Sequence, residues 1–146
     1  MDVQYTQGTV SAEDIRVHLT HCNEDFVSPL EKKVDIQEYS AKLFENALTF
    51  EAWSGNTLIG LVAAYFNDPC GEAGYITNVS TIKTYMGKGI ASALINLSIE
   101  YAREHHFKRI ILEVEKGNLS AIRLYEKLRF HDFEDKHSTI LMKFET

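Results

Sequence analysis

Apolar residues recur at two different periods along the chain, and the changes of period predict where helices and strands lie. Ser11-Ala-Glu-Asp14 resembles a capping box and predicts a helix that runs to about His21. Asp35 resembles an N-cap for a second helix that ends near Asn46, with apolar residues at helical spacing: Ile36, Tyr39, Leu43 and Phe44. Residues 23–33 between these helices are mixed and polar, which favours a loop with a broken turn.

Strand-like patterns flank these two helices. Val3–Gln7 reads as a short strand before the first helix. After the second helix, Leu48–Trp53 alternates between apolar and polar residues, and Thr57–Phe66 is rich in β-branched and aromatic residues. The turn Ser54-Gly-Asn56 joins these two segments, which predicts a hairpin. A loop at residues 67–71 precedes the next strand candidate, Gly74–Ile82.

The second half of the chain alternates between helix and strand. A helix begins at Gly89, with one apolar stripe: Ile90, Leu94, Leu97 and Tyr101. The segment Arg109–Val114 predicts a strand, and Asn118 begins another helix whose inward positions are Ala121, Leu124, Tyr125 and Leu128. The final segments, Phe130–Phe133 and Thr139–Phe144, are expected to pair as an antiparallel hairpin.

The predicted order is therefore β-α-α-β-β-β-α-β-α-β-β. The strand–helix–strand unit at residues 74–114 demands a parallel crossover, whereas the hairpins are antiparallel. This order predicts an α/β fold with a mixed, mostly antiparallel central sheet of about seven strands and helices on both faces. The 146 residues are a typical length for a single domain, which we expect to span 1–146.

Composition and charge narrow the classes of partner. Acidic residues exceed basic ones by 21 − 15 = 6, so the chain lacks the basic footprint that non-specific nucleic-acid binding needs. Its two cysteines, Cys22 and Cys70, have neither metal-like spacing nor the number for a disulfide framework. We therefore expect no metal and a reducing, cytoplasmic location. No run of about 20 apolar residues predicts a membrane span, and the first residues do not resemble a signal peptide.

The segment Lys83-Thr-Tyr-Met-Gly-Lys-Gly-Ile-Ala-Ser92 joins a predicted strand to the best predicted helix. Free backbone N–H groups and a partial positive charge mark the first turn of a helix, and glycine lets an anion approach that backbone closely. The segment is thus a candidate phosphate site, to which Lys88 could add charge. The alternative is a tight turn that needs glycine for its own conformation. The pattern G-x-G-x-x-G is absent, because Ser92 stands where its third glycine would be.

Two motifs resemble those of the GCN5-related N-acetyltransferases. Met86-Gly-Lys-Gly-Ile-Ala91 is similar to the family's [Q/R]-x-x-G-x-[G/A], except that Met86 replaces the expected Gln or Arg. Asn118-Leu-Ser-Ala-Ile-Arg-Leu-Tyr-Glu-Lys-Leu-Arg-Phe130 is similar to N-x-x-A-x-x-x-Y-x-x-x-G-F, except that Arg129 replaces the glycine. The predicted element order matches the family fold throughout, although the first seventy or so residues carry no specific motif.

The resemblance implies an enzyme that transfers an acetyl group from acetyl-CoA to an amine. The backbone of Gly87 to Ala91 and the Ser92 hydroxyl would hold the pyrophosphate, and Val79 to Thr81 would pair with the pantetheine arm after diverging from the strand Arg109–Val114. The cofactor-binding candidates are therefore Val79, Thr81, Met86, Gly87, Lys88, Gly89, Ile90, Ala91, Ser92 and Asn118. The N–H of Val79 would also stabilise the developing oxyanion.

Two further residues have both a structural and a functional interpretation. Asn118 can cap the helix that it begins, and in the family an asparagine here contacts the cofactor. Tyr125 is either a core tyrosine or the general acid that protonates the departing thiolate. A general base is not evident from the sequence. The candidates are four carboxylates, for each of which the residue pattern alone favours a solvated surface group: Glu51, Asp68, Glu72 and Glu113.

The leading hypothesis is direct attack by a small-molecule primary amine in a ternary complex with acetyl-CoA. The alternatives are a coenzyme-A-binding regulatory module without turnover and an acetyltransferase acting on a protein or peptide amine. The sequence leaves the acyl chain length open, and the oligomeric state open between monomer and homodimer.

Overall fold

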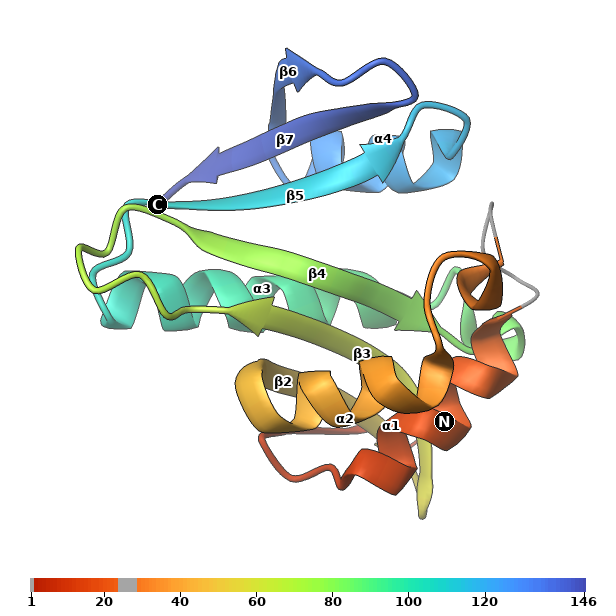
Figure 1. The fold of residues 1–146 in the computed structure, drawn as a ribbon. Coiled ribbons are helices and arrows are strands. Elements are labelled where there is room, and N and C mark those ends of the chain that lie inside the picture. The colour runs from red at the N-terminus through yellow and green to blue at the C-terminus, as the bar shows by residue number, and fades with distance from the viewer. Residues whose placement is uncertain (1, 24–28) are drawn as a thin grey trace.

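The computed structural model describes residues 2–23 and 29–146, and its elements follow one another in the predicted order (Figure 1). The strands are β1 (Gln4–Gln7), β2 (Leu48–Ser54), β3 (Thr57–Tyr65), β4 (Gly74–Thr81), β5 (Arg109–Glu115), β6 (His131–Asp135) and β7 (Thr139–Glu145). The α-helices are α1 (Ala12–Cys22), α2 (Ile36–Asn46), α3 (Ile90–Glu104) and α4 (Leu119–Lys127). Two short 3₁₀ turns, η2 (Leu30–Lys32) and η3 (Lys83–Tyr85), lie in segments without a predicted element. Part of the loop predicted at residues 23–33 lies outside the described residues.

The predicted helix starts are confirmed in detail. Ser11 accepts a hydrogen bond from the Asp14 backbone, and the Asp14 carboxylate accepts one from the Ser11 backbone, which completes a capping box. The Asp35 side chain caps α2 by accepting a hydrogen bond from the Glu38 backbone. Phe44 belongs to the apolar pattern of α2 but is about half exposed, so the buried face of that helix is narrower than the pattern predicts.

The described residues form a seven-stranded sheet with the order β1-β2-β3-β4-β5-β7-β6. Every neighbouring pair is antiparallel except β4 and β5, which are parallel and joined through α3, as the crossover requires. The predicted hairpin of β6 and β7 is confirmed, with β7 lying between β5 and β6. The mixed α/β architecture predicted from the sequence is therefore the observed one.

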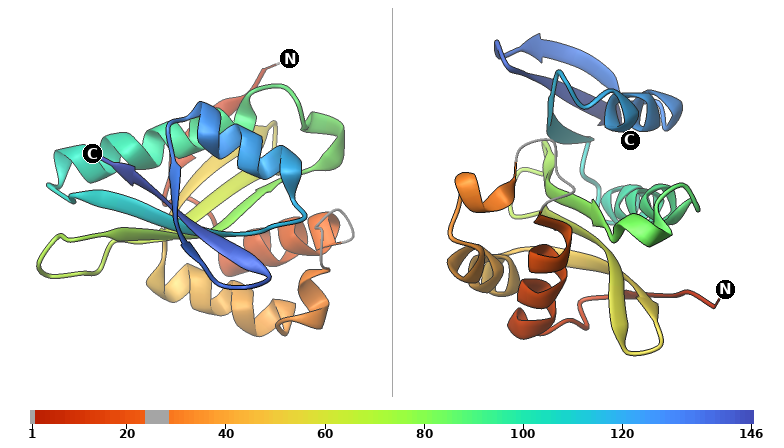
Figure 2. Two further views of the ribbon diagram at one scale, coloured as in Figure 1. Left: turned by 90° about the horizontal axis from the view of Figure 1, so that it is seen from above. Right: turned by 90° about the vertical axis from the view of Figure 1, so that its right-hand side faces the viewer.

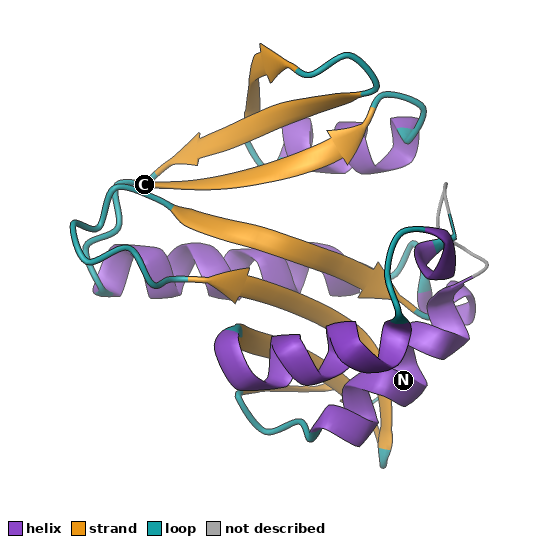
Figure 3. Ribbon diagram, in the orientation of Figure 1, coloured by secondary structure: helices purple, strands orange, loops and turns teal. Residues whose placement is uncertain are grey.

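Helices cover both faces of the sheet (Figures 2 and 3). On one face, α1 and α2 pack over β2 and β3 around a small apolar cluster that includes Leu19, Leu43 and Leu61. On the other face, α3 and α4 enclose the larger cluster, to which Phe50, Leu94 and Phe130 contribute. Burial on both faces explains why β3 is apolar along nearly its whole length rather than alternating.

The strands β4 and β5 pair only at their beginnings and then diverge (Figure 1). Pairing is limited to Gly74–Ile76 with Ile110–Leu112. Beyond these residues β4 carries a bulge, because Ala63 lies opposite Asn78 while Ala64 lies opposite Ile76. The bulge leaves Thr77 without a partner in β3 and bends the strand. The Tyr39 hydroxyl, from α2, donates a hydrogen bond to the Thr77 carbonyl oxygen over 3.2 Å.

Candidate functional site

Two cavities open on opposite sides of the gap between β4 and β5. The larger, of about 550 Å³, lies against α3 and α4. The smaller, of about 320 Å³, lies on the side of η2 and α2. Val79, Asn118 and Tyr125 line both cavities, so the two spaces meet at these residues. A ligand in one cavity can therefore reach a ligand in the other through the gap.

The glycine turn forms one wall of the larger cavity. Gly87 and Gly89 have φ values of 77° and 81°, a left-handed conformation that side chains disfavour. A Cβ built at either glycine would have no protein atom within 4 Å, and both residues line the cavity. The turn conformation thus needs glycine, as the simpler interpretation holds, and the same residues leave open space for a ligand.

The first turn of α3 presents free backbone donors to that space. Gly89 is the N-cap and supplies no side-chain hydrogen bond, whereas α1, α2 and α4 are capped by Ser11, Asp35 and Asn118. The N–H groups at the start of an α-helix have no partner within the helix, and they attract anions. The turn therefore fits a phosphate-bearing ligand such as coenzyme A, both in its donors and in the space above its glycines.

Most of the residues expected to bind the cofactor line the larger cavity: Val79, Thr81, Met86, Gly87, Gly89, Ile90, Ala91, Ser92 and Asn118. Lys88 is the exception, because it is exposed and does not line that cavity. The cavity also includes residues that sequence reasoning did not name for this role: Cys22, Tyr85, Ser120, Ala121 and Leu124. Tyr85 belongs to η3, a turn that no pattern predicted.

Asn118 and Tyr125 take structural positions and also line the gap. The Asn118 side chain caps α4 by accepting a hydrogen bond from the Ala121 backbone over 3.3 Å. Tyr125 is only 7% exposed and belongs to the apolar cluster under α4. Burial raises the pKa of Tyr125 to about 12, so its hydroxyl keeps its proton at neutral pH. Both interpretations left open by the sequence are thus compatible with the geometry.

Arg129, the departure from the second motif, occupies a position that favours glycine. Its φ is 76°, and it follows α4 in a Schellman motif in which Arg129 N donates to Glu126 O and Phe130 N donates to Tyr125 O. The arginine therefore keeps the backbone geometry of the motif at a conformational cost. The Tyr125 backbone is held by the same hydrogen bonds, so the departure does not displace it.

Glu51, one of the four candidate bases, is fully buried and serves the N-terminal turn. Its carboxylate accepts hydrogen bonds from the Thr6 hydroxyl, the Gly8 N–H, and both the N–H and the hydroxyl of Thr9. It lines neither cavity. The expectation that Glu51 could reach the cleft is therefore wrong: the side chain fixes residues 6–9 to β2 instead.

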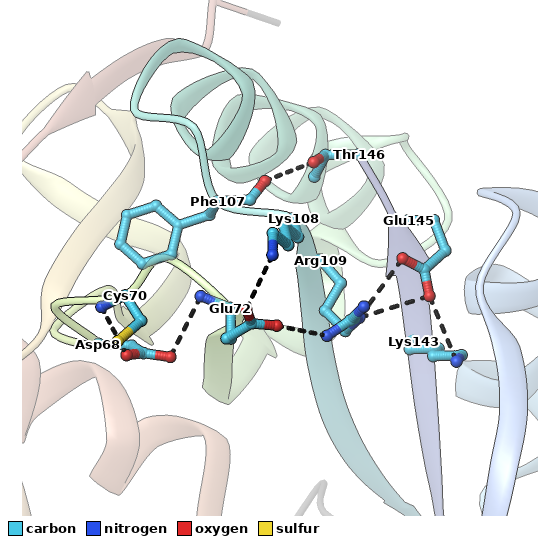
Figure 4. A network of polar contacts seen from close by, with 9 residues as sticks. All are labelled: Asp68, Cys70, Glu72, Phe107, Lys108, Arg109, Lys143, Glu145 and Thr146. Carbon is cyan, nitrogen blue, oxygen red and sulfur yellow. Dashed lines mark hydrogen bonds and ion pairs between the residues drawn. The ribbon is translucent and has the colours of Figure 1, made fainter.

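Asp68 and Glu72 lie in the loop before β4, at the end of that strand remote from the gap (Figure 4). The Asp68 carboxylate accepts hydrogen bonds from the backbone of Cys70 and Glu72. Glu72 forms ion pairs with Lys108 at 2.8 Å and with Arg109 at 3.4 Å, and these cations keep its pKa below the ordinary value. Both carboxylates are therefore held at the opposite end of β4 from the gap, away from the position that a general base would need.

Glu113 is the one member of the four that lines either of these two cavities. It is exposed on β5, forms part of the smaller cavity, and accepts a hydrogen bond from the Thr139 hydroxyl. Two charged neighbours in the same cavity, Lys33 and Glu115, form an ion pair of 2.6 Å that joins the segment after η2 to β5. Sequence reasoning missed Lys33, Glu115 and Tyr39, because only the folded chain brings these distant segments together.

Among the described residues, no cluster of His, Cys, Asp and Glu side chains is arranged to hold a metal ion. No helix in the described part of the chain has the length and apolar character to cross a membrane.

Comparisons with known proteins agree with these observations. Residues 13–130 match the model of the acetyltransferase (GNAT) family. Mycothiol acetyltransferase of Corynebacterium glutamicum is 29% identical over 94 residues, which cover 64% of this chain and 32% of that protein. Streptothricin acetyltransferase A of Bacillus subtilis is 30% identical over 115 residues, covering 76% and 64% of the two chains. N-alpha-acetyltransferase 30 of Saccharomyces cerevisiae is 39% identical over 57 residues, covering 39% and 32%.

The chain spans about a third of the length of the mycothiol acetyltransferases that it matches. Among solved structures, the PaiA N-acetyltransferase from Thermoplasma acidophilum in complex with coenzyme A has a TM-score of 0.80 at 17% identity, with complete coverage of both chains. A likeness at this identity establishes the shared fold.

Proposed function

The chain belongs to the acetyltransferase (GNAT) family, and on that basis we propose that it transfers an acetyl group from acetyl-CoA to a primary amine of a small-molecule acceptor. The observation that carries the proposal is the meeting of two cavities at Val79, Asn118 and Tyr125. One cavity has free helix N–H groups and glycines suited to a pyrophosphate. The other has carboxylates suited to an amine.

The residues at the gap can be given specific tasks. Acetyl-CoA supplies an activated thioester, and acetyl transfer to an amine forms a C–N bond and breaks the C–S bond. The Val79 N–H donates to the carbonyl oxygen as negative charge develops on it. The Tyr125 hydroxyl, which burial keeps protonated, donates its proton to the leaving sulfur. Because both groups line both cavities, direct attack in a ternary complex needs no intermediate carrier on the protein.

Glu113 is our choice for the general base. An ammonium acceptor must lose a proton before its nitrogen can attack. Glu113 is the candidate carboxylate that lines the smaller cavity, which we call the acceptor cavity. Its neighbour Glu115 is paired with Lys33, whereas Glu113 has a hydroxyl partner and no cation partner among the described residues. Glu113 therefore presents negative charge to an incoming cation and can accept its proton, directly or through a water molecule.

The size of the acceptor cavity supports a small amine. A volume of about 320 Å³ is near the lower end of the range for small-molecule sites, roughly 300–1,000 Å³. The Lys33–Glu115 ion pair links two segments that line this cavity. A protein or peptide amine is the competing acceptor, and the identity to N-alpha-acetyltransferase 30 favours it.

A coupled assay tests the proposal and separates these alternatives. Release of free thiol from acetyl-CoA is measured with spermidine, glucosamine, glycinamide and a tripeptide with a free N-terminus. We expect one of the three small amines to give the highest kcat/KM. A preference for the tripeptide would favour the peptide acetyltransferase. Binding of acetyl-CoA without amine-dependent thiol release from any acceptor would favour a regulatory module without turnover.

A further inference from the structure

A buried polar chain beside the gap has no part in the roles assigned above. It consists of His18 from α1 and of Ser80 and Asn78 from β4, with exposed fractions of 2%, 5% and 8%. His18 Nδ1 lies 3.0 Å from the Leu58 carbonyl oxygen, and His18 Nε2 lies 2.9 Å from Ser80 Oγ. Ser80 Oγ lies 2.8 Å from the side-chain amide of Asn78, which lines the acceptor cavity.

The Leu58 carbonyl sets the direction of the first hydrogen bond, because a carbonyl oxygen can only accept. His18 Nδ1 therefore carries a proton. Burial lowers the pKa of His18 to about 4, so the ring is neutral at pH 7 and Nε2 has a lone pair. The Ser80 hydroxyl is the nearest donor to that lone pair. Cys22 Sγ, at 3.7 Å, is also within reach, but a thiol is the weaker donor.

One hydroxyl proton cannot serve two acceptors. With Oδ1 of Asn78 toward Ser80, the hydroxyl donates to Oδ1, and the lone pairs of Ser80 Oγ and His18 Nε2 then face each other at 2.9 Å. Turning the carboxamide by 180° removes this conflict, because its NH₂ group donates to Ser80 while Ser80 donates to His18. The two halves of a carboxamide have nearly the same shape, so hydrogen-bond partners decide their placement. The oxygen of Asn78 then takes the place of the side-chain nitrogen, which in the orientation with Oδ1 toward Ser80 forms no hydrogen bond with a described residue.

We propose that Asn78 binds the acceptor, with its side-chain oxygen accepting a hydrogen bond from the attacking amine, and that His18 and Ser80 are positioning residues that hold this orientation. The inference rests on the proposed function, because it concerns the acceptor side of the same site. Asn78 immediately precedes Val79 and follows the bulge at Thr77, whose carbonyl is bound by Tyr39. The amide is thus carried by a fixed piece of backbone beside the point where the two cavities meet.

This arrangement specifies the acceptor further. The attacking nitrogen must keep one N–H for Asn78 after it gives a proton to the base. A primary ammonium group satisfies both partners. A secondary ammonium group also keeps one N–H for Asn78 after deprotonation, whereas a tertiary ammonium group keeps none, so the arrangement admits primary and secondary amines and excludes tertiary ones.

Nuclear magnetic resonance of the ligand-free protein tests the orientation directly. We expect nitrogen shifts of His18 that show a protonated Nδ1 and an unprotonated Nε2 at pH 7. We also expect nuclear Overhauser contacts between the Asn78 NH₂ protons and Ser80. The opposite tautomer, or an Asn78 NH₂ group without these contacts, would overturn the inference. This experiment needs no acceptor, so it decides the orientation even if no amine is acetylated.

Variants test the role in the reaction, with the best amine of the panel as acceptor. Asn78→Leu, which keeps the shape of the side chain, should lower kcat/KM for the amine by about 10- to 100-fold and leave the Kd for acetyl-CoA unchanged. Ser80→Ala should lower the same ratio about threefold to tenfold, and Ser80→Thr, which keeps the hydroxyl, should restore it. Ser98→Ala is the control, because Ser98 is a fully buried serine in α3 whose hydroxyl donates to the Ile95 carbonyl.

An unchanged kcat/KM in Asn78→Leu would contradict the inference. Equal losses in amine turnover and acetyl-CoA affinity would also contradict it, since they would indicate a general structural defect. Failure of the wild-type protein to acetylate any amine would instead contradict the proposed function.

Discussion

Substitutions at Gly89, at the start of α3, can distinguish two reasons for a glycine there. One is the left-handed turn conformation, and the other is the open space for a ligand. Gly89 has a φ of 81°, and a Cβ there would meet no protein atom within 4 Å. A valine at this position must either adopt an unfavourable conformation or change the turn. Asparagine tolerates the left-handed region much better. Gly89→Val and Gly89→Asn therefore differ in backbone strain, while both add a side chain to the cavity wall.

The expected magnitudes follow from these two effects. A left-handed conformation costs an ordinary residue about 1–2 kcal/mol, and a β-branched residue at least that much. Gly89→Val should thus lower the melting temperature of the ligand-free protein by roughly 3–8 °C, and Gly89→Asn by less than about 2 °C. If the pyrophosphate lies on the first amides of α3, both variants should weaken acetyl-CoA binding at least tenfold, which is about 1.4 kcal/mol.

The assay combines thermal unfolding without ligand and calorimetric titration with acetyl-CoA. Met86→Gln is the matched control, because it restores the usual residue of the motif at a side chain that is 49% exposed. Its Kd should stay within about threefold of the wild-type value, as expected when backbone N–H groups hold the anion. If Gly89→Asn bound acetyl-CoA as tightly as the wild type, or if Gly89→Val and Met86→Gln had equal effects, the phosphate would lie elsewhere.

Four further predictions concern acid–base chemistry and stability. Tyr125→Phe should lower kcat about 100-fold and leave the Kd for acetyl-CoA unchanged. Burial raises the Tyr125 pKa to about 12, so the pH–rate profile of the wild-type protein should show no loss of rate from ionisation of Tyr125 between pH 7 and 10. Glu113→Gln should lower kcat/KM for the amine about 100-fold in the thiol-release assay. Glu51→Gln should instead leave kcat unchanged and lower the free energy of unfolding by about 2–3 kcal/mol in urea denaturation, because the Glu51 carboxylate accepts hydrogen bonds from residues 6–9. The pKa of His18 is about 4 in the folded protein, against an ordinary value of 6.5, so between these pH values the unfolded chain binds a proton that the folded protein does not. The free energy of unfolding should therefore fall by roughly 3 kcal/mol as the pH is lowered from 6.5 to 4. His18→Gln should remove this part of the pH dependence, as measured by urea unfolding. Arg129→Gly should raise the free energy of unfolding by about 0.5–1 kcal/mol, because glycine adopts the φ of 76° without strain, and an unchanged or lower value would contradict this interpretation of the departure from the motif.

Local signals were sufficient to predict the α-helices and strands of this fold. The capping box at Ser11, the cap at Asp35 and the change to alternating residues at Leu48 each depend on interactions within a few residues, and the structure confirms them. The parallel pairing of β4 with β5 was predictable because a strand–helix–strand unit leaves few other arrangements. The turns η2 and η3 were missed, since three residues of 3₁₀ helix have no periodicity to detect.

The candidate site was predictable only where it follows a continuous motif. The glycine turn and Asn118 lie in such segments, and both line the larger cavity. The acceptor side is assembled from η2, α2, β4 and β5, whose contributing residues lie far apart in the sequence and share no motif. For this reason the sequence ranked Glu51 beside Glu113, although the fold buries the first under the N-terminal turn and exposes the second in a cavity. Lys88 fits the motif by type, but its side chain is exposed outside the cavity.

The divergence of β4 from β5 has a cost that a ligand can offset. After Ile76 and Leu112 the two strands exchange no ladder hydrogen bonds, so the edge of β4 that bears Val79 offers backbone groups to the gap. Backbone N–H and C=O groups away from water need partners, and an extended molecule with amide groups can supply them as an added strand would. The pantetheine arm of coenzyme A has two amides in an extended chain. Its binding would therefore complete the sheet locally and bring the thioester to the residues shared by both cavities, which links the interrupted strand pairing to the proposed chemistry.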